Sequence, residues 1–127
     1  MTATGAQTYH ESDGKAVEVT LTATVAKDQV AYVQGWLGLV TKDGVSGENT
    51  NLTIDEREYQ FTVPAALAVA KGDIVYIDVT DLTGHTPDDS AYSKTAGSNK
   101  IRLFKATAAQ DVNNMVTGIM LVGRYLS

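Results

Sequence analysis

The sequence contains no cysteine, which excludes a disulfide scaffold, a thiolate nucleophile, a cysteine-bound zinc site and an iron–sulfur cluster. It has only two histidines, His10 and His85, so a serine–histidine catalytic pair has few possible members. A Gly-x-x-x-x-Gly-Lys-[Ser/Thr] phosphate loop, a Gly-x-Gly-x-x-Gly turn and a Gly-x-Ser-x-Gly nucleophile turn are also lacking. These absences favour a protein that is not an enzyme and that needs no cofactor.

Positive charge and long apolar runs are scarce as well. Ten Lys and Arg stand against fifteen Asp and Glu, which gives a net charge of −5. Nucleic-acid binding needs clustered basic residues, and the densest group here, Lys100, Arg102 and Lys105, has the spacing of a solvated strand face. No apolar run approaches the ~20 residues of a membrane span, and residues 1–15 contain no secretory signal. We therefore expect no nucleic-acid partner, no membrane partner and no signal-directed export.

Residues branched at Cβ are abundant, and such residues favour strands over helices. The segments Ala16–Thr22 and Glu58–Val63 alternate apolar with polar residues, and Ile74–Val79 is apolar on both faces, as a central strand is. The predicted strands are Ala16–Thr22, Gln29–Val33, Trp36–Thr41, Asn51–Ile54, Glu58–Val63, Ile74–Val79, Ile101–Thr107 and Met115–Leu126. About eight short strands separated by turn residues predict an all-β fold, either a small β-sandwich or a compact β-barrel, and no internal repeat is evident.

One segment has the character of a helix. The run from Pro64 to Lys71 is rich in alanine, Pro64 suits a first helical position, and Gly72 suits the position after a helix. The sequence therefore predicts one short helix at about 64–71, with Leu67 and Ala70 buried against the sheet.

The length of 127 residues fits a single domain. The polar residues 1–14 predict a flexible N-terminal arm, and residues 15–127 a single β domain. Residues 80–100 hold few large apolar side chains and predict a long irregular loop, which is either functional or mobile.

Within that loop, acidic residues and a histidine lie close together in sequence. Asp81, His85, Asp88 and Asp89 offer oxygen and nitrogen ligands, but their spacing is not that of a calcium loop. Asp, Gly, Pro and Ser also form turns without any metal, and we expect no metal site here. A small metal-assisted enzyme that uses these four residues remains the third hypothesis for the function.

Aromatic residues offer a different kind of site. Trp36 is the only tryptophan, and with Leu37 it marks either a subunit interface or ordinary core packing. A β-sandwich module that binds carbohydrate or a cell-surface ligand is the second hypothesis, and it would use exposed aromatic side chains. The aromatic candidates are Tyr32, Trp36, Tyr59, Tyr76 and Tyr92, most of which we expect to lie in the core.

The order of several segments resembles a known family, the capsid decoration or cement proteins of tailed phages, of which some members are labelled predicted RecA/RadA-like phage recombinases. The resemblance runs from about Tyr9 to Tyr125, although Lys27-Asp28 stands where the family has a Gly-Asp turn. The lack of a phosphate loop gives the recombinase label no support. The segments that carry the resemblance are Gly14–Leu21, Ala26–Val33, Gly35–Val40, Gly47-Glu48, Asn51–Ile54, Glu58–Pro64 and Ala68–Tyr76.

The resemblance implies a structural protein that binds the outer surface of an expanded phage head and stabilises it. It implies the major capsid protein as partner, a homotrimer at local three-fold sites, and a location on the outer capsid surface of the virion after synthesis in the host cytoplasm. It further implies that the polar arm contacts the capsid. The arm residues concerned are Thr4, Gln7, Thr8, Tyr9 and His10.

Overall fold

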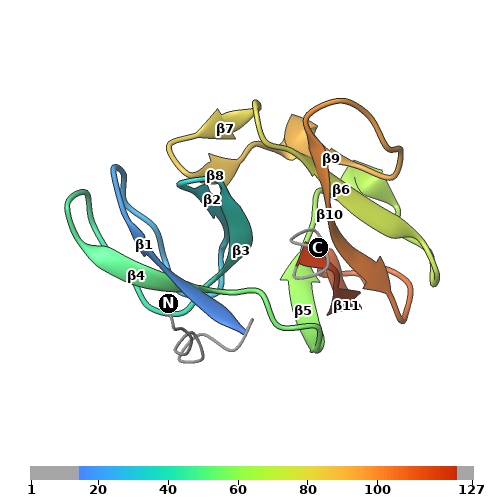
Figure 1. Ribbon diagram of the computed structural model, residues 1–127. Helices are drawn as coiled ribbons and strands as arrows, with labels where there is room; N and C mark the ends of the chain where they lie inside the picture. The colour runs from blue at the N-terminus through green and yellow to red at the C-terminus, as the bar shows by residue number, and fades with distance from the viewer. Residues whose placement is uncertain (1–14, 123–127) are drawn as a thin grey trace, which may run out of the picture.

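The computed structural model describes residues 15–122 and confirms the all-β fold: two main sheets pack against each other (Figure 1). The first sheet has the antiparallel order β1-β4-β3-β2. The second has the order β5-β11-β10-β6-β9. The bounds of the first sheet are β1 (Ala16–Thr20), β2 (Val30–Val33), β3 (Trp36–Val40) and β4 (Asn49–Thr53). Those of the second are β5 (Glu58–Thr62), β6 (Ile74–Asp78), β9 (Tyr92–Ser93), β10 (Lys100–Ala106) and β11 (Met115–Met120).

The alternation seen in the sequence matches the faces of these strands. In β5, Phe61 is buried whereas Glu58 and Gln60 are exposed. In β11 every second residue is fully buried, which places Val116 and Met120 in the core. Period-two burial of this kind fixes the strand register, because a shift by one residue would turn the apolar set outward.

The two sheets repeat one arrangement, which corrects the expectation that the chain has no internal repeat. Strands β1, β2, β3 and β4 correspond to β5, β6, β10 and β11, since each set of four has the same order in its sheet, and β9 is an additional edge strand of the second. The cross-strand pairs also correspond: Val40 pairs with Leu52 in the first sheet, and Ala106 pairs with Gly118 in the second. We call residues 15–54 the first half, and residues 57–78 together with 100–120 the second half.

The hydrogen bonds outside the strands follow the same pattern. The Asp28 N–H donates to the Val40 carbonyl, and the Gly72 N–H donates to the Ala106 carbonyl, both at 2.8 Å. Asp28 and Gly72 share a positive φ, of 71° and 91°. The sequence retains this likeness mainly in Val25–Val33 and Val69–Ile77, where Val, Ala, Lys and Tyr recur at equal spacing.

A shared core joins the halves. Val30, Leu37 and Leu39 of the first half lie in one apolar cluster with Phe61 and Phe104 of the second. Val30 and Leu39 are paired neighbours and so lie on the same face of their sheet. A second cluster, formed by the other face of the first sheet, contains Val19, Leu21, Val25, Ala31, Val33, Val40 and Leu52.

The helix predicted at about 64–71 is shorter than expected. Only η1 (Ala65–Leu67) is helical, as a 3-10 turn, because Ala68 takes a left-handed φ of 51° and ends it. The Val69 backbone then forms hydrogen bonds with the backbone N–H and the side-chain amide of Gln110, so no helix continues where it was predicted. The buried residue is Val69, whereas Leu67 is half-buried and Ala70 is exposed.

Residues 79–99, which we call the insert, stand where the first half has the two-residue turn Gln34-Gly35. Three short strands and a 3-10 turn order the segment that was predicted to be irregular. The insert crosses the top of the molecule from one sheet to the other (Figure 1). Its elements are β7 (Leu82–Thr83), β8 (Thr86–Pro87), η2 (Asp89–Ala91) and β9.

His85 fastens the insert to the edge of β2. The Thr22 N–H donates to Nε2 at 2.9 Å, so Nδ1 carries the ring proton and donates to the Tyr32 carbonyl at 3.1 Å. The Tyr32 N–H in turn donates to the His85 carbonyl at 2.9 Å. The insert therefore covers the backbone of β2, and β9 covers that of β6.

Candidate binding surfaces

The predicted capsid-binding residues of the arm cannot be placed within this fold. Thr4, Gln7, Thr8, Tyr9 and His10 lie outside the described residues. Residue 15, at the start of the described chain, precedes the edge strand β1, whose other edge pairs with β4.

The predicted interface residues Trp36 and Leu37 differ in exposure. Leu37 is 3 % exposed and packs inside the core that joins the two halves. Trp36 is half-buried and contacts both apolar clusters at the edge where they meet. The side chain that this pair offers to a partner is therefore that of Trp36.

The tyrosines considered for carbohydrate binding lie mostly against the core. Tyr32, Tyr59 and Tyr92 are half-buried and pack on the shared apolar cluster. Burial raises the pKa of Tyr92 to about 12, and the neighbouring Asp89 charge adds to the rise. Burial likewise raises the pKa of Tyr59. These rings are packed mainly as structural side chains.

The acidic run in the insert does not converge on one point. The Ser90 hydroxyl donates to Asp81 at 2.6 Å, and the Thr83 hydroxyl donates to Asp88 at 2.7 Å. His85 is 9 % exposed, and both of its ring nitrogens face backbone groups. Within residues 15–122 no three His, Asp or Glu side chains are placed to hold a metal ion. The polar side chains of this run stabilise turns.

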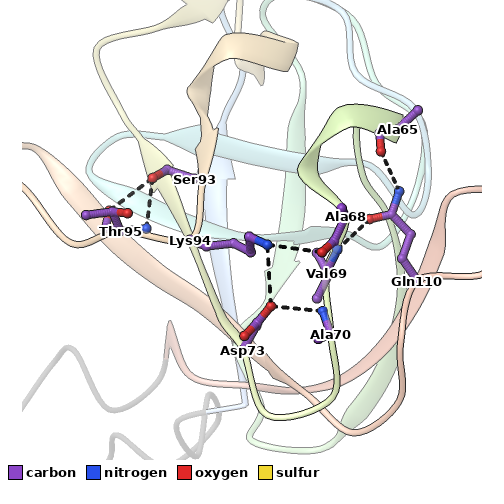
Figure 2. A network of polar contacts seen from close by, with 9 residues as sticks. All are labelled: Ala65, Ala68, Val69, Ala70, Asp73, Ser93, Lys94, Thr95 and Gln110. Carbon is purple, nitrogen blue, oxygen red and sulfur yellow. Dashed lines mark hydrogen bonds and ion pairs between the residues drawn. The ribbon is translucent and has the colours of Figure 1, made fainter.

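A polar network ties the insert to the second half (Figure 2). Lys94 donates to the Ala68 carbonyl at 3.0 Å and forms an ion pair with Asp73 at 3.7 Å. Asp73 also accepts a hydrogen bond from the Ala70 N–H at 2.8 Å. In the first half, Gln29 accepts the equivalent bond from the Ala26 N–H, also at 2.8 Å. The second half thus has the Asp73 carboxylate where the first half has the Gln29 amide, and the charge of this carboxylate pairs with Lys94 of the insert.

The surface of the described residues includes the following two hollows. One, of about 410 Å³, lies between the halves and is lined by residues such as Lys27, Leu39, Phe61, Pro87 and Tyr92. The other, of about 580 Å³, lies on the outer face of the second sheet. It has an apolar floor with two lysines, and its lining includes Lys71, Lys105, Ile119 and Leu121. Both hollows are open to solvent.

Two exposed apolar residues at turn tips were not predicted from the sequence. Val45 is 52 % exposed between β3 and β4, and Val112 is 96 % exposed between β10 and β11. Each lies among Gly, Asp, Ser or Asn, which is a turn signal, so an isolated valine in a predicted turn could have identified them.

Comparison with known proteins gives one match. The family model for phage cement proteins matches residues 11–121, which span both sheets and the insert. No curated protein and no solved structure matches the chain. Within the described part of the chain no helix is long and apolar enough to cross a membrane. Because the match covers most of the sequence, the chain belongs to the phage cement protein family.

Proposed function

We propose that this protein binds the outer surface of an expanded phage head and stabilises the shell, and that it acts by binding and not by catalysis. Membership of the cement family carries the proposal, because it supports a capsid-decoration role and the phage capsid as partner. A protein that binds only the assembled shell adds its binding free energy to what must be lost before the shell opens. Two packed sheets with a shared core suit this load-resisting role.

We further propose that three chains assemble at a local three-fold site of the head, with the major capsid protein as partner. Three linked copies convert weak single contacts into tight binding. The half-buried Trp36 indole is our candidate for the contact between chains, because tryptophan is enriched at interface hot spots. The arm residues Thr4, Gln7, Thr8, Tyr9 and His10 are our candidates for contacts with the capsid, where an extended segment can add a strand to a sheet edge.

Co-sedimentation of the purified protein with DNA-free heads tests the proposal. Expanded and unexpanded heads are mixed with a concentration series, and bound protein is quantified in the pellet. We expect saturable binding to expanded heads alone, near one trimer for each three-fold site. Binding to neither form contradicts the decoration role. Sedimentation equilibrium of the free protein, for the wild type and Trp36→Ala, tests the trimer separately.

A further inference from the structure

Two apolar side chains are exposed in corresponding turns of the two halves. Val45 lies in the β3–β4 turn and Val112 in the β10–β11 turn, and they are the exposed large apolar residues of the described chain. The turns correspond because the Glu48 N–H donates to the Val45 carbonyl and the Asn114 N–H donates to the Asp111 carbonyl, both at 3.0 Å. Val112 stands one position beyond the counterpart of Val45. Single exposed valines are common, but one in each corresponding turn is a repeated surface feature.

The first tip is held firmly by its own hydrogen bonds. The Val45 N–H donates to the Glu48 carboxylate at 2.9 Å. The preceding Gly44 exchanges two backbone hydrogen bonds with Val25, at 2.9 and 3.1 Å. A side chain on a constrained turn loses little conformational freedom when it binds, so more of its apolar burial contributes to affinity.

The second tip is built by different side chains to the same effect. The Asp111 carboxylate accepts hydrogen bonds from the N–H groups of Asn113 at 2.8 Å and Met115 at 2.9 Å. Gln110 joins the start of this turn to Val69 through two hydrogen bonds, at 2.9 and 3.0 Å. Val112 is therefore presented to solvent from a rigid turn.

The two tips face separate regions of space. In Figure 1 the blue-green β3–β4 turn lies at the left end of the molecule, and the orange β10–β11 turn lies at the right end. Both sheets stand between these turns, so each tip is available to a different neighbour. Two contacts at opposite ends suit a protein that joins neighbours.

We propose that Val45 and Val112 are the apolar contact points through which one chain bridges two neighbouring subunits of the phage capsid. The inference rests on the proposed decoration of the head and adds the surfaces that perform it. Each valine inserts into an apolar site on a capsid subunit, and the repeated turn lets the same kind of site be used twice. Binding at one end raises the effective concentration of the other tip near its own site.

The experiment compares binding of Val45→Ser, Val112→Ser and the double variant to expanded heads by co-sedimentation. We expect each single change to weaken apparent affinity about tenfold and the double change about a hundredfold, since each removes one apolar contact. The matched controls are Ser46→Ala and Asn113→Ser, which alter exposed neighbours on the same turns. These should bind as the wild type does. Thermal unfolding midpoints should stay within about 2 °C for all variants, because the changed side chains are exposed.

The outcomes separate this inference from the proposed function. If the wild type binds expanded heads and the double variant binds equally well, the decoration role stands and the two-point contact is wrong. If one single variant matches the double variant and the other matches the wild type, the contact is one-ended and the bridge is wrong. If the wild type binds no heads, the proposed function fails and the bridge fails with it.

Discussion

The two halves share one backbone arrangement but fill it with different side chains. In the first half, Gly38 lies beneath Leu52, and a Cβ on Gly38 would lie 3.1 Å from the Leu52 Cβ and 2.6 Å from the Thr53 carbonyl oxygen. In the second half the sizes are exchanged: Phe104 fills the place that corresponds to Gly38, and Gly118 the place that corresponds to Leu52. The strands therefore pair in the same register in both halves, but the large side chain lies on β4 in the first half and on β10 in the second.

The halves also differ in how they connect their central strands. Two residues join β2 to β3, whereas the insert joins β6 to β10. The longer connection is stabilised by contacts with both halves, through His85 to the first and through Lys94 to the second. The insert thus adds hydrogen bonds to both halves, which the shared apolar cluster already joins.

Removing the Phe104 ring of the second half should have the largest effect on the free energy of unfolding. Phe104 is fully buried and stacks on Phe61 with ring centroids 4.2 Å apart. We expect Phe104→Ala to reduce the free energy of unfolding by about 3–5 kcal/mol, because it leaves a cavity between the sheets. Urea denaturation monitored by tryptophan fluorescence measures this loss. A loss below about 1 kcal/mol would show that the core closes around the gap.

Replacing Gly118 with leucine, the residue at the corresponding position of the first half, should reduce the free energy of unfolding almost as much. In Gly118→Leu, the new Cβ would collide with the Phe104 ring and lie 2.9 Å from the Lys105 carbonyl oxygen. We expect the free energy of unfolding to fall by about 3 kcal/mol, because the larger side chain overpacks the core.

The matching exchange tests the cause of that loss. Combining Gly118→Leu with Phe104→Gly restores the pair found in the first half, Gly38 with Leu52. We expect the double variant to be more stable than the sum of the single changes by at least about 1 kcal/mol, as residues in contact are coupled. Strict additivity in a denaturation cycle would refute the equivalence of the two positions.

High pH should weaken the attachment of the insert, a segment that the first half lacks. The folded pKa of Tyr92, about 12, lies above its ordinary value near 10, so folding favours the neutral phenol. This contribution is complete below pH 10 and is lost as the pH rises through 12, for a total of about 2–3 kcal/mol. Tyr92→Phe should remove that part of the pH dependence. Equal stability profiles of the variant and the wild type from pH 9 to pH 12 would contradict this prediction.

The smallest effect is expected at the charged link between the insert and the second half. Lys94→Met removes the half-exposed ion pair with Asp73 and should cost no more than about 1 kcal/mol. Added salt should reduce this difference further, because partly exposed ion pairs are screened. Lys42→Met, on an exposed turn of the first half, is the control and should cost nothing measurable. A loss above about 2 kcal/mol would indicate a larger role for the network in Figure 2.

Local pattern was sufficient to predict most strands. Alternation located β1 and β5, and the apolar run identified β6 as a strand with neighbours on both sides. The helix prediction was wrong in length, because alanine propensity could not reveal that Val69 pairs with Gln110, a residue distant in sequence. Tertiary hydrogen bonds of this kind override a weak local preference.

The repeat and the candidate binding surfaces were harder to predict. Only Val25–Val33 and Val69–Ile77 keep visible likeness, and the insert and the exchange of Gly38 with Phe104 obscure the rest. Trp36 was predicted to belong either to the core or to an interface, and its half-buried state depends on where two clusters meet. The outward direction of Val45 and Val112 depends on turn geometry that the residue types alone do not determine.

The short turn Gln34-Gly35 has a practical consequence for presenting foreign peptides on particles. Both residues have positive φ, 50° and 85°, and an added Cβ on Gly35 would meet no atom within 4 Å. The corresponding place in the second half already accommodates residues 79–99, which add the edge strand β9 and leave the order of the other four strands unchanged. We expect an epitope of similar length, inserted between Gln34 and Gly35, to leave the fold intact. If the protein coats phage heads, each head would then carry an ordered array of that epitope.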